Sequence, residues 1–216
     1  MMGHTLRLFT DRFAPGEAAT ILPAIRALYV VEGSLNVRAA GISASLDPNS
    51  AWCGVGEFAV SAGKSGAKVL RWEVAADTNA PAARLGSHST LSLAAPIVLP
   101  APQVLLRCDR VEFPPGGEAL THVHQGPGIR CLLTGSIRID STGVSHTYGP
   151  GDAWFESGPE PVYAAASATE STAFVRVMIL PRTCHSKSSI RYVRPEDVDK
   201  PKNQKYQIFA DELISP

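Results

Sequence analysis

The stretch PGGEALTHVHQGPGIRCLLTG occupies residues 115–135 and decides the fold of the chain. His122 and His124 are one residue apart, and side chains at i and i+2 of a strand point to the same face. Leu120 shares that face, which predicts that both imidazoles point inward. Neutral imidazole is a common metal ligand, so the pair indicates a metal site. Beyond the Gly-Pro-Gly turn, an apolar run ends at Gly135 and predicts the second strand of a hairpin.

A second motif, YGPGDAWFESG, follows one hairpin later at residues 148–158. The pattern Gly-x4-His-x-His with its hairpin resembles the first motif of the cupin superfamily, and the Pro-Gly-Asp opening resembles the second. The resemblance implies an all-β protein built from antiparallel, jelly-roll-like β-barrels. It is incomplete, because the glutamate that cupins usually carry on the second strand falls on Gly128. The third histidine that cupins carry after the second motif is absent from residues 159–163.

The motif region is repeated earlier in the chain at a fixed offset. Gly33 and Gly135 are 102 residues apart, and the Ala-Trp pairs at 51–52 and 153–154 keep the same offset. A fixed period of this kind indicates a duplicated structural unit. The sequence therefore predicts a bicupin, with two tandem antiparallel barrels. The strands expected in the second barrel lie near 104–112, 118–124, 129–134, 136–140, 144–148, 152–156, 161–165 and 172–180.

The repeat divides the chain into four parts. The predicted parts are an N-terminal cupin barrel at 1–80, a linker and opening strand at 81–102, a C-terminal cupin barrel at 103–185, and a C-terminal tail at 186–216. In the first barrel, the positions equivalent to His122 and His124 are Thr20 and Leu22, so we expect no metal ligands there. Apolar residues in the tail predict that it docks on its own barrel or on a partner chain. The cupin resemblance implies a homodimer that exchanges terminal strands.

Composition limits the classes of function. Lys and Arg total 20, as do Asp and Glu, so no net basic field exists to attract nucleic acid or an anionic membrane. The longest apolar stretch, residues 21–31, is interrupted by Pro23 and Arg26 and is too short to span a membrane. The four cysteines have no C-x-x-C spacing, and the N-terminus has no signal-peptide core. We expect a cytoplasmic protein with reduced thiols that binds neither nucleic acid nor membrane.

The histidine pair carries the strongest chemical hypothesis. His122 and His124 are expected to hold a divalent transition metal, and Zn, Fe, Ni, Cu and Mn are equally compatible with two imidazoles. The alternative is a vestigial pair that lines a pocket without metal. A site with only two histidines carries less negative charge than a full cupin site. We therefore expect it to take an anion from another source.

Gly128 and Arg130 are expected to share the inward face of the second strand. Gly128 either shapes a tight turn, since glycine allows positive φ, or leaves open a coordination position that a substrate carboxylate fills. Arg130 is a candidate for binding a substrate carboxylate, because a guanidinium in an apolar barrel needs an anion. The alternative for Arg130 is an ion pair with Asp140, Asp152 or Glu156.

Three residues of the second motif region are further candidates. Glu156 is a candidate catalytic base or replacement ligand, with exposure at a strand end as the alternative. Tyr163 is a second catalytic candidate, because it lies near the position of the missing histidine and would hydrogen-bond a ligand. Trp154 is a candidate substrate-binding residue, although its counterpart Trp52 favours a role in the core.

Two functions remain open, because cupin barrels host unrelated activities. The first is a metal-dependent enzyme, of the dioxygenase or isomerase class that the resemblance implies, acting on a small anionic organic molecule. The second is a non-catalytic barrel that binds or senses a small ligand, which the absent glutamate and third histidine favour. No helix-turn-helix pattern or basic segment indicates a transcriptional regulator.

Overall fold

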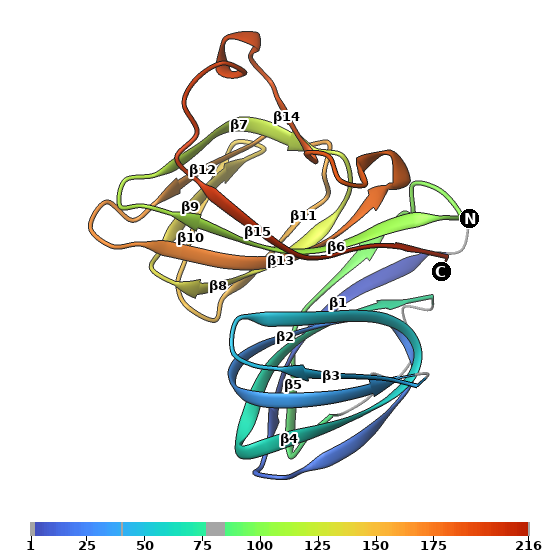
Figure 1. Ribbon diagram of the computed structural model, residues 1–216. Helices are drawn as coiled ribbons and strands as arrows, with labels where there is room; N and C mark the ends of the chain where they lie inside the picture. The colour runs from blue at the N-terminus through green and yellow to red at the C-terminus, as the bar shows by residue number, and fades with distance from the viewer. Residues whose placement is uncertain (1–2, 40, 77–84, 216) are drawn as a thin grey trace. The chain divides into compact units, whose positions relative to one another are not determined.

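The computed structural model describes residues 3–39, 41–76 and 85–215. These residues form fifteen β-strands and two short 3-10 helices, η1 (Arg182–Cys184) and η2 (Pro195–Asp197), with no α-helix among them. Neither helix is long or apolar enough to cross a membrane. The chain divides into two compact units, the first ending at Val98 and the second comprising Leu99–Ser215. The expected antiparallel all-β architecture is therefore confirmed (Figure 1).

The N-terminal unit is a five-stranded antiparallel sheet. Its strands are β1 (His4–Phe13), β2 (Ala18–Ala39), β3 (Ile42–Leu46), β4 (Ser50–Ala75) and β5 (His88–Ile97), paired in the order β3-β2-β4-β1-β5. Residues 25–30 of β2 pair with β4 on both of their edges, with register shifts where the strands bend. The sheet therefore curls around its own core, which includes Phe13, Leu28 and Phe58.

Two five-stranded antiparallel sheets form the C-terminal unit. The first contains β7 (Glu118–His124), β9 (Ile137–Ser141), β10 (Val144–Tyr148), β12 (Val162–Ala166) and β14 (Ile190–Tyr192), in the order β10-β9-β12-β7-β14. The second contains β6 (Val104–Phe113), β8 (Gly128–Thr134), β11 (Ala153–Glu156), β13 (Thr172–Pro181) and β15 (Lys205–Ile214), in the order β11-β8-β13-β6-β15. The eight strands expected in this barrel are confirmed, because no end differs by more than one residue.

The two units share an order of strand pairing. In the first unit β1 pairs with β4 on one side and with the last strand, β5, on the other. In the second unit β6 pairs in the same way with β13 and with the last strand, β15. The long strand β2 spans the part of the repeat that β7, β8 and β9 span in the second unit, and β4 spans that of β11, β12 and β13. The offset of 102 residues therefore fits β2 and β4, whereas β5 and β15 begin 117 residues apart (205 − 88).

The segment between the units differs from the sequence expectation. The sequence assigns 81–102 to a linker and to the opening strand of the second barrel. Instead, β5 pairs with β1 and belongs to the first unit. The outer edge of β1 carries backbone N–H and C=O groups that need partners, and β5 supplies them. The predicted boundary between residues 80 and 81 lies outside the described residues.

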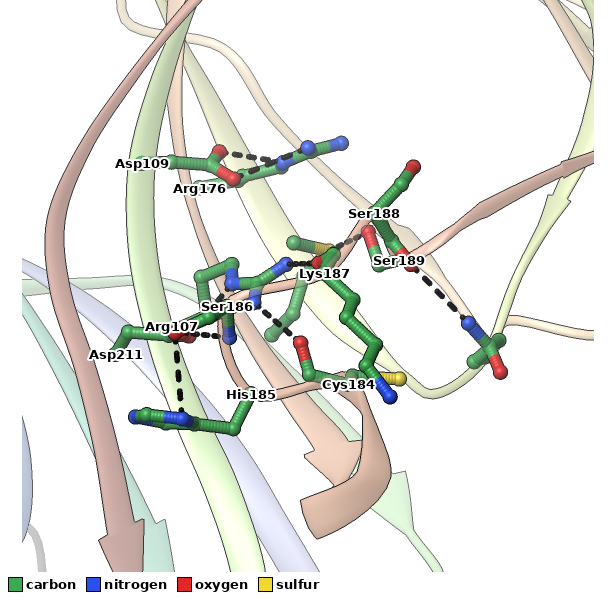
Figure 2. A network of polar contacts seen from close by, with 12 residues as sticks. Arg107, Asp109, Arg176, Cys184, His185, Ser186, Lys187, Ser188, Ser189 and Asp211 are labelled. Atoms are coloured by element: carbon green, nitrogen blue, oxygen red, sulfur yellow. Dashed lines mark hydrogen bonds and ion pairs between the residues drawn. The ribbon is translucent and has the colours of Figure 1, made fainter.

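The segment from residue 186 onward adds one edge strand to each sheet of the second unit. β14 pairs with β7, and β15 pairs with β6 (Figure 1). Arg107 of β6 holds this segment, because its Nε lies 2.7 Å from Oδ1 of Asp211 on β15. Its two terminal nitrogens donate to the carbonyl oxygens of Cys184 and Lys187 at 2.8 Å (Figure 2). One buried guanidinium therefore joins three parts of the C-terminal segment.

Replacing Asp211 by asparagine should lower the free energy of unfolding by about 2 kcal/mol at pH 7, because hydrogen bonds to a charged group are lost. Burial alone would raise the pKa of Asp211, but hydrogen bonds from Arg107 and the Ser186 amide hold it below its ordinary value. A carboxyl with a lowered folded pKa stabilises above its unfolded pKa and loses that stability as the pH falls through the folded value. The difference from wild type should therefore shrink below about pH 4.

Urea unfolding at pH 7 and pH 3 measures this difference. The matched control is Glu212→Gln, which removes the charge of the exposed neighbouring side chain and should change the unfolding free energy by less than about 0.5 kcal/mol. An Asp211→Asn deficit that stays the same at both pH values would contradict the ion pair.

A buried ion network lies in the N-terminal unit. Arg71, which is fully buried, donates from Nε to Asp11 at 2.6 Å and from Nη1 to Glu73. Glu73 also accepts from Nε of Arg26 at 2.5 Å, and Asp11 accepts from the Ser89 hydroxyl at 2.5 Å. Two buried cations thus face two buried carboxylates, which is the arrangement that makes burial of such charges tolerable.

Candidate functional site

A β-bulge in β7 points the histidines into the second unit. Val162 of β12 pairs with His122, and Ala164 pairs with Ala119. Between these two pairs, β7 therefore contains one residue more than β12. The extra residue changes the alternation, and Ala119, His122 and His124 are buried while Leu120 is only half-buried. The inward direction of both histidines agrees with the sequence expectation, but the expected sharing of a face with Leu120 is wrong.

The bulge also fixes the His122 ring. Nδ1 of His122 lies 2.8 Å from the carbonyl oxygen of Leu120. Because a carbonyl only accepts, Nδ1 carries the proton and Nε2 presents a lone pair. That Nε2 lies 3.2 Å from Nε2 of His124, and the two rings meet edge to face. Two buried imidazoles therefore converge on one point through their Nε2 atoms.

Glu156 and Arg130 complete the centre. Oε2 of Glu156 lies 3.2 Å from Nε2 of His124 and 2.7 Å from Nη2 of Arg130. The other carboxylate oxygen, Oε1, accepts from the indole of Trp154 at 2.9 Å. Arg130 also donates from Nη1 to the carbonyl oxygen of Gly128 at 2.7 Å. Of the acidic partners considered for Arg130, the structure pairs it with Glu156.

Burial and charge set the protonation states at this centre. Burial lowers the pKa of His122, and it lowers that of His124 to about 3. Burial alone would raise the pKa of Glu156, but the neighbouring Arg130 and His124 hold it far below its ordinary value. Burial lowers the pKa of Arg130 to about 10. At neutral pH the centre therefore contains two neutral imidazoles, one carboxylate and one guanidinium.

A small cavity of about 20 Å³ lies against these side chains. This volume accommodates about one water-sized group. Apolar core residues such as Phe174 and Val162 line the rest of it. The polar side chains that line it are His122, His124, Arg130, Glu156, Arg176 and Tyr206. Nδ1 of His124 is buried and has no hydrogen-bond partner among the described residues. Nη2 of Arg130 and Oε2 of Glu156 are likewise without a hydrogen bond there, although they form an ion pair with each other.

Gly128 is required by close packing. A Cβ at this position would lie 2.6 Å from the carbonyl oxygen of Val177, 2.8 Å from Cγ of Met178 and 3.0 Å from Nη1 of Arg130. Its φ angle is not in the positive region, so the expectation of a turn that needs positive φ is wrong. The Val177 carbonyl, the Met178 side chain and the Arg130 guanidinium together fill the space next to Cα of residue 128.

The structure brings five of the six predicted site residues into direct contact and places Tyr163 elsewhere. His122, His124, Arg130 and Glu156 form the centre. Trp154 is 3% exposed, packs against Phe174 with ring centroids 5.3 Å apart, and holds Glu156 through its indole. The hydroxyl of Tyr163 donates to Glu118 at 2.6 Å in an exposed position, away from the cavity.

Three residues near the centre are absent from the sequence prediction. Arg176 binds Asp109 through Nε and Nη2 at 2.6 and 3.1 Å, and both side chains are buried. Tyr206 comes from β15, the last strand. Arg176 interrupts the apolar strand Phe174–Leu180, and a charge in such a run signals a buried pair. No comparable sequence signal identifies Tyr206.

The donor set fits a divalent metal as two adjacent ligands. Metal–nitrogen bonds of about 2.0–2.1 Å separate neighbouring ligand atoms by about 2.9–3.4 Å, and the two Nε2 atoms are 3.2 Å apart. The Leu120 carbonyl orients His122 as the outer partner of a metal ligand usually does. Among the described residues, no group of three or more His, Cys, Asp or Glu side chains is placed to hold a metal ion. Further ligands would therefore be water or substrate.

Comparison with known proteins identifies the fold. No protein-family model matches the chain, and no curated protein matches it. Among solved structures, oxalate decarboxylase from Bacillus subtilis is 13% identical, with a TM-score of 0.63 over 90% of this chain and 73% of that chain. Salicylate 1,2-dioxygenase from Pseudaminobacter salicylatoxidans is 13% identical, with a TM-score of 0.58 over 87% and 74%.

AerE from Microcystis aeruginosa is a third similar structure, 12% identical, with a TM-score of 0.59 over 83% of this chain and 88% of that chain. The Bacillus oxalate decarboxylase is described with Mn(II) centres. At this level of identity the likeness concerns the fold and not the activity. The structural neighbours are cupin-fold proteins, and the chain has the cupin β-barrel fold.

Proposed function

We propose that the protein is a bicupin whose C-terminal barrel holds a divalent transition metal on His122 and His124 and acts on a small anionic organic molecule. The observation that carries the proposal is the buried pair of Nε2 atoms 3.2 Å apart. Fold neighbours that include a decarboxylase with Mn(II) centres and a dioxygenase support a metal-dependent enzyme. We keep the dioxygenase and isomerase classes, and a cytoplasmic homodimer, as parts of the proposal.

The repeated strand order supports the bicupin assignment. Each unit places its first strand between the same two partners. In the N-terminal unit Thr20 and Leu22 stand at the positions of the two histidines and are exposed. Two buried arginines of that unit, Arg26 and Arg71, are neutralised by its own carboxylates. We therefore assign the N-terminal barrel a structural role.

Arg130 and Glu156 are the residues that we expect to respond to a substrate. A bound metal would supply Lewis-acid chemistry. A substrate carboxylate would compete with Glu156 for the Arg130 guanidinium. Loss of that cation would raise the pKa of Glu156, so that the released carboxylate accepts a proton beside His124. Trp154 would position Glu156, and we assign no role to Tyr163.

A second candidate function is a barrel that binds a small ligand without chemistry. The observation that favours it is that the polar side chains of the centre already contact one another. His124 can donate from Nε2 to Glu156, and Glu156 is already neutralised by Arg130. In such a protein the histidines complete a polar network and bind no metal.

Elemental analysis of protein purified without added metal tests the two candidates. The metal-binding enzyme should contain about one transition-metal ion per chain, and the variant His122→Ala with His124→Ala should lose more than 90% of it, because both ligands are removed. The matched control is His146→Ala, which removes an exposed histidine of the same unit and should retain the metal. Wild-type protein that neither contains metal nor binds added Mn²⁺, Fe²⁺ or Zn²⁺ would contradict the enzyme and support the ligand-binding barrel.

A further inference from the structure

A second, larger pocket of about 490 Å³ adjoins the small cavity at the histidines. The two cavities share Arg176, Ile190 and Tyr206 in their linings. Ile190 comes from β14 and Tyr206 from β15, the edge strands that residues 186–215 add to the two sheets. We call the larger space the outer pocket. Its volume lies in the range of sites that bind small organic molecules, whereas the inner cavity holds about one water.

The outer pocket has a positive lining. Arg107, Arg176, Lys187 and Lys202 line it, and Asp109 is the single acidic side chain among its lining residues. Lys202 is held by the carbonyl oxygens of the η2 segment and lies over the ring of Tyr192, 4.5 Å from its centroid. Because Asp211 pairs with Arg107 and Asp109 pairs with Arg176, the attraction for an anion comes mainly from Lys187 and Lys202, which have no carboxylate partner among the described residues.

Arg176 offers one unused donor at the wall between the cavities. Its Nε and Nη2 bind Asp109, and Nη1 has no hydrogen-bond partner among the described residues. Figure 2 shows the two contacts to Asp109 and a third nitrogen that points away from it. The side chain is 4% exposed and lines both cavities, so this donor is open to a ligand or water in the pocket.

Tyr206 provides a second donor beside Arg176. Its ring centroid is 5.8 Å from the guanidinium carbon of Arg176. The hydroxyl accepts from Nε2 of Gln204 at 3.1 Å, so its own proton stays available to donate. Burial raises the pKa of Tyr206, which keeps that proton in place at neutral pH. Ile190, Tyr192 and Ile208 give the rest of the outer pocket an apolar surface.

We propose that the outer pocket binds an organic carboxylate, with its two oxygens on Nη1 of Arg176 and the hydroxyl of Tyr206 and its apolar body against Ile190, Tyr192 and Ile208. Two single donors match the two oxygens of a carboxylate. Because Arg176 and Tyr206 also line the inner cavity, the carboxylate end faces the histidine centre. This inference deepens the proposed function. It rests on that function for one point, namely that the carboxylate end of the ligand is the end that reacts. A dicarboxylate without an apolar body would leave the outer pocket unused.

An NMR titration of metal-free protein with benzoate, benzyl alcohol and inorganic phosphate tests the proposal. Benzoate should bind at least about tenfold more tightly than either of the others, since only benzoate has both the carboxylate and the apolar body. Tyr206→Phe should weaken benzoate about tenfold, because it removes one hydrogen bond to a charged group. Tyr206 is 45% exposed, so this variant keeps the fold. The matched control is Tyr29→Phe in the N-terminal unit, with an expected change below about twofold.

Two results would overturn the proposal. One is equal binding of benzoate and benzyl alcohol, or no binding of benzoate. The other is unchanged benzoate affinity in both Tyr206→Phe and Arg176→Lys. The His122→Ala, His124→Ala variant separates this inference from the metal hypothesis. Benzoate should bind that variant within about threefold of wild type, because neither histidine contacts the carboxylate. Loss of metal with retained benzoate binding would then concern the metal site alone.

Discussion

Replacing Arg71 by methionine should lower the free energy of unfolding of the N-terminal unit by about 3–5 kcal/mol, because the change leaves buried carboxylates without their cation. Asp11 is 1% exposed and, among the described side chains, would keep the hydroxyl of Ser89. Glu73 would keep Arg26. The stacking of the guanidinium on Phe9, 4.1 Å from the ring centroid, would also be lost. Urea unfolding followed by tryptophan fluorescence measures the effect.

Two variants sharpen this test. Arg12→Met makes the same substitution at an exposed position of β1 and should change the unfolding free energy by less than about 0.5 kcal/mol. Adding Asp11→Asn to Arg71→Met removes the buried carboxylate that has lost its cation. The double variant should recover about half or more of the lost unfolding free energy. A loss below about 1 kcal/mol for Arg71→Met would show that the ion network does not hold this unit together.

Replacing Arg130 by methionine should cost the C-terminal unit about 3–5 kcal/mol at pH 7 and much less at pH 4. In the wild-type protein the pKa of Glu156 is held low by Arg130 and His124 against the effect of burial. Its contribution to stability is therefore present above the unfolded pKa and is lost only as the pH falls through the lowered folded value. Without Arg130, burial dominates and the folded pKa rises above the unfolded one. The variant should then lose stability as the pH rises from about 4 to 7.

Unfolding of Arg130→Met between pH 4 and pH 7 gives this profile. Arg138→Met is the control, since Arg138 is an exposed arginine of the same unit paired with Asp140. The double variant Arg130→Met, Glu156→Gln has no carboxylate at residue 156 that could be left unpaired. Its stability should therefore lack the pH dependence of the single variant. A single variant whose deficit is independent of pH would indicate lost packing of the arginine and not an unpaired Glu156.

The strands of the second unit could be predicted closely because turn residues bound each of them. Gly135 and the Pro150-Gly151 pair end strands where the structure also ends them. The convergence of His122 and His124 also followed from their spacing. These features depend on local backbone geometry, which single residues and their periodicity record.

Features that depend on partners distant in sequence could not be predicted. The bulge before His122 arises from the pairing of β7 with β12, so sequence alternation alone placed Leu120 on the wrong face. Tyr206 reaches the centre only because β15 pairs with β6. Tyr163 lies near the sequence position where the third cupin histidine was expected. Its strand nevertheless directs the hydroxyl to Glu118. Such contacts are decided by sheet assembly, about which a single sequence says little.

The crowding at Gly128 opposes the introduction of a glutamate ligand at this position. A glutamate at residue 128 would need the volume that the Arg130 guanidinium fills, and even its Cβ would press on the backbone of Val177. Losing Arg130 first would leave Glu156 buried without the cation that pairs with it. Conversion to the four-ligand site that the cupin resemblance implies therefore needs several substitutions in a favourable order. Each single intermediate is expected to fold less well than the present chain, which keeps this centre in its two-histidine form.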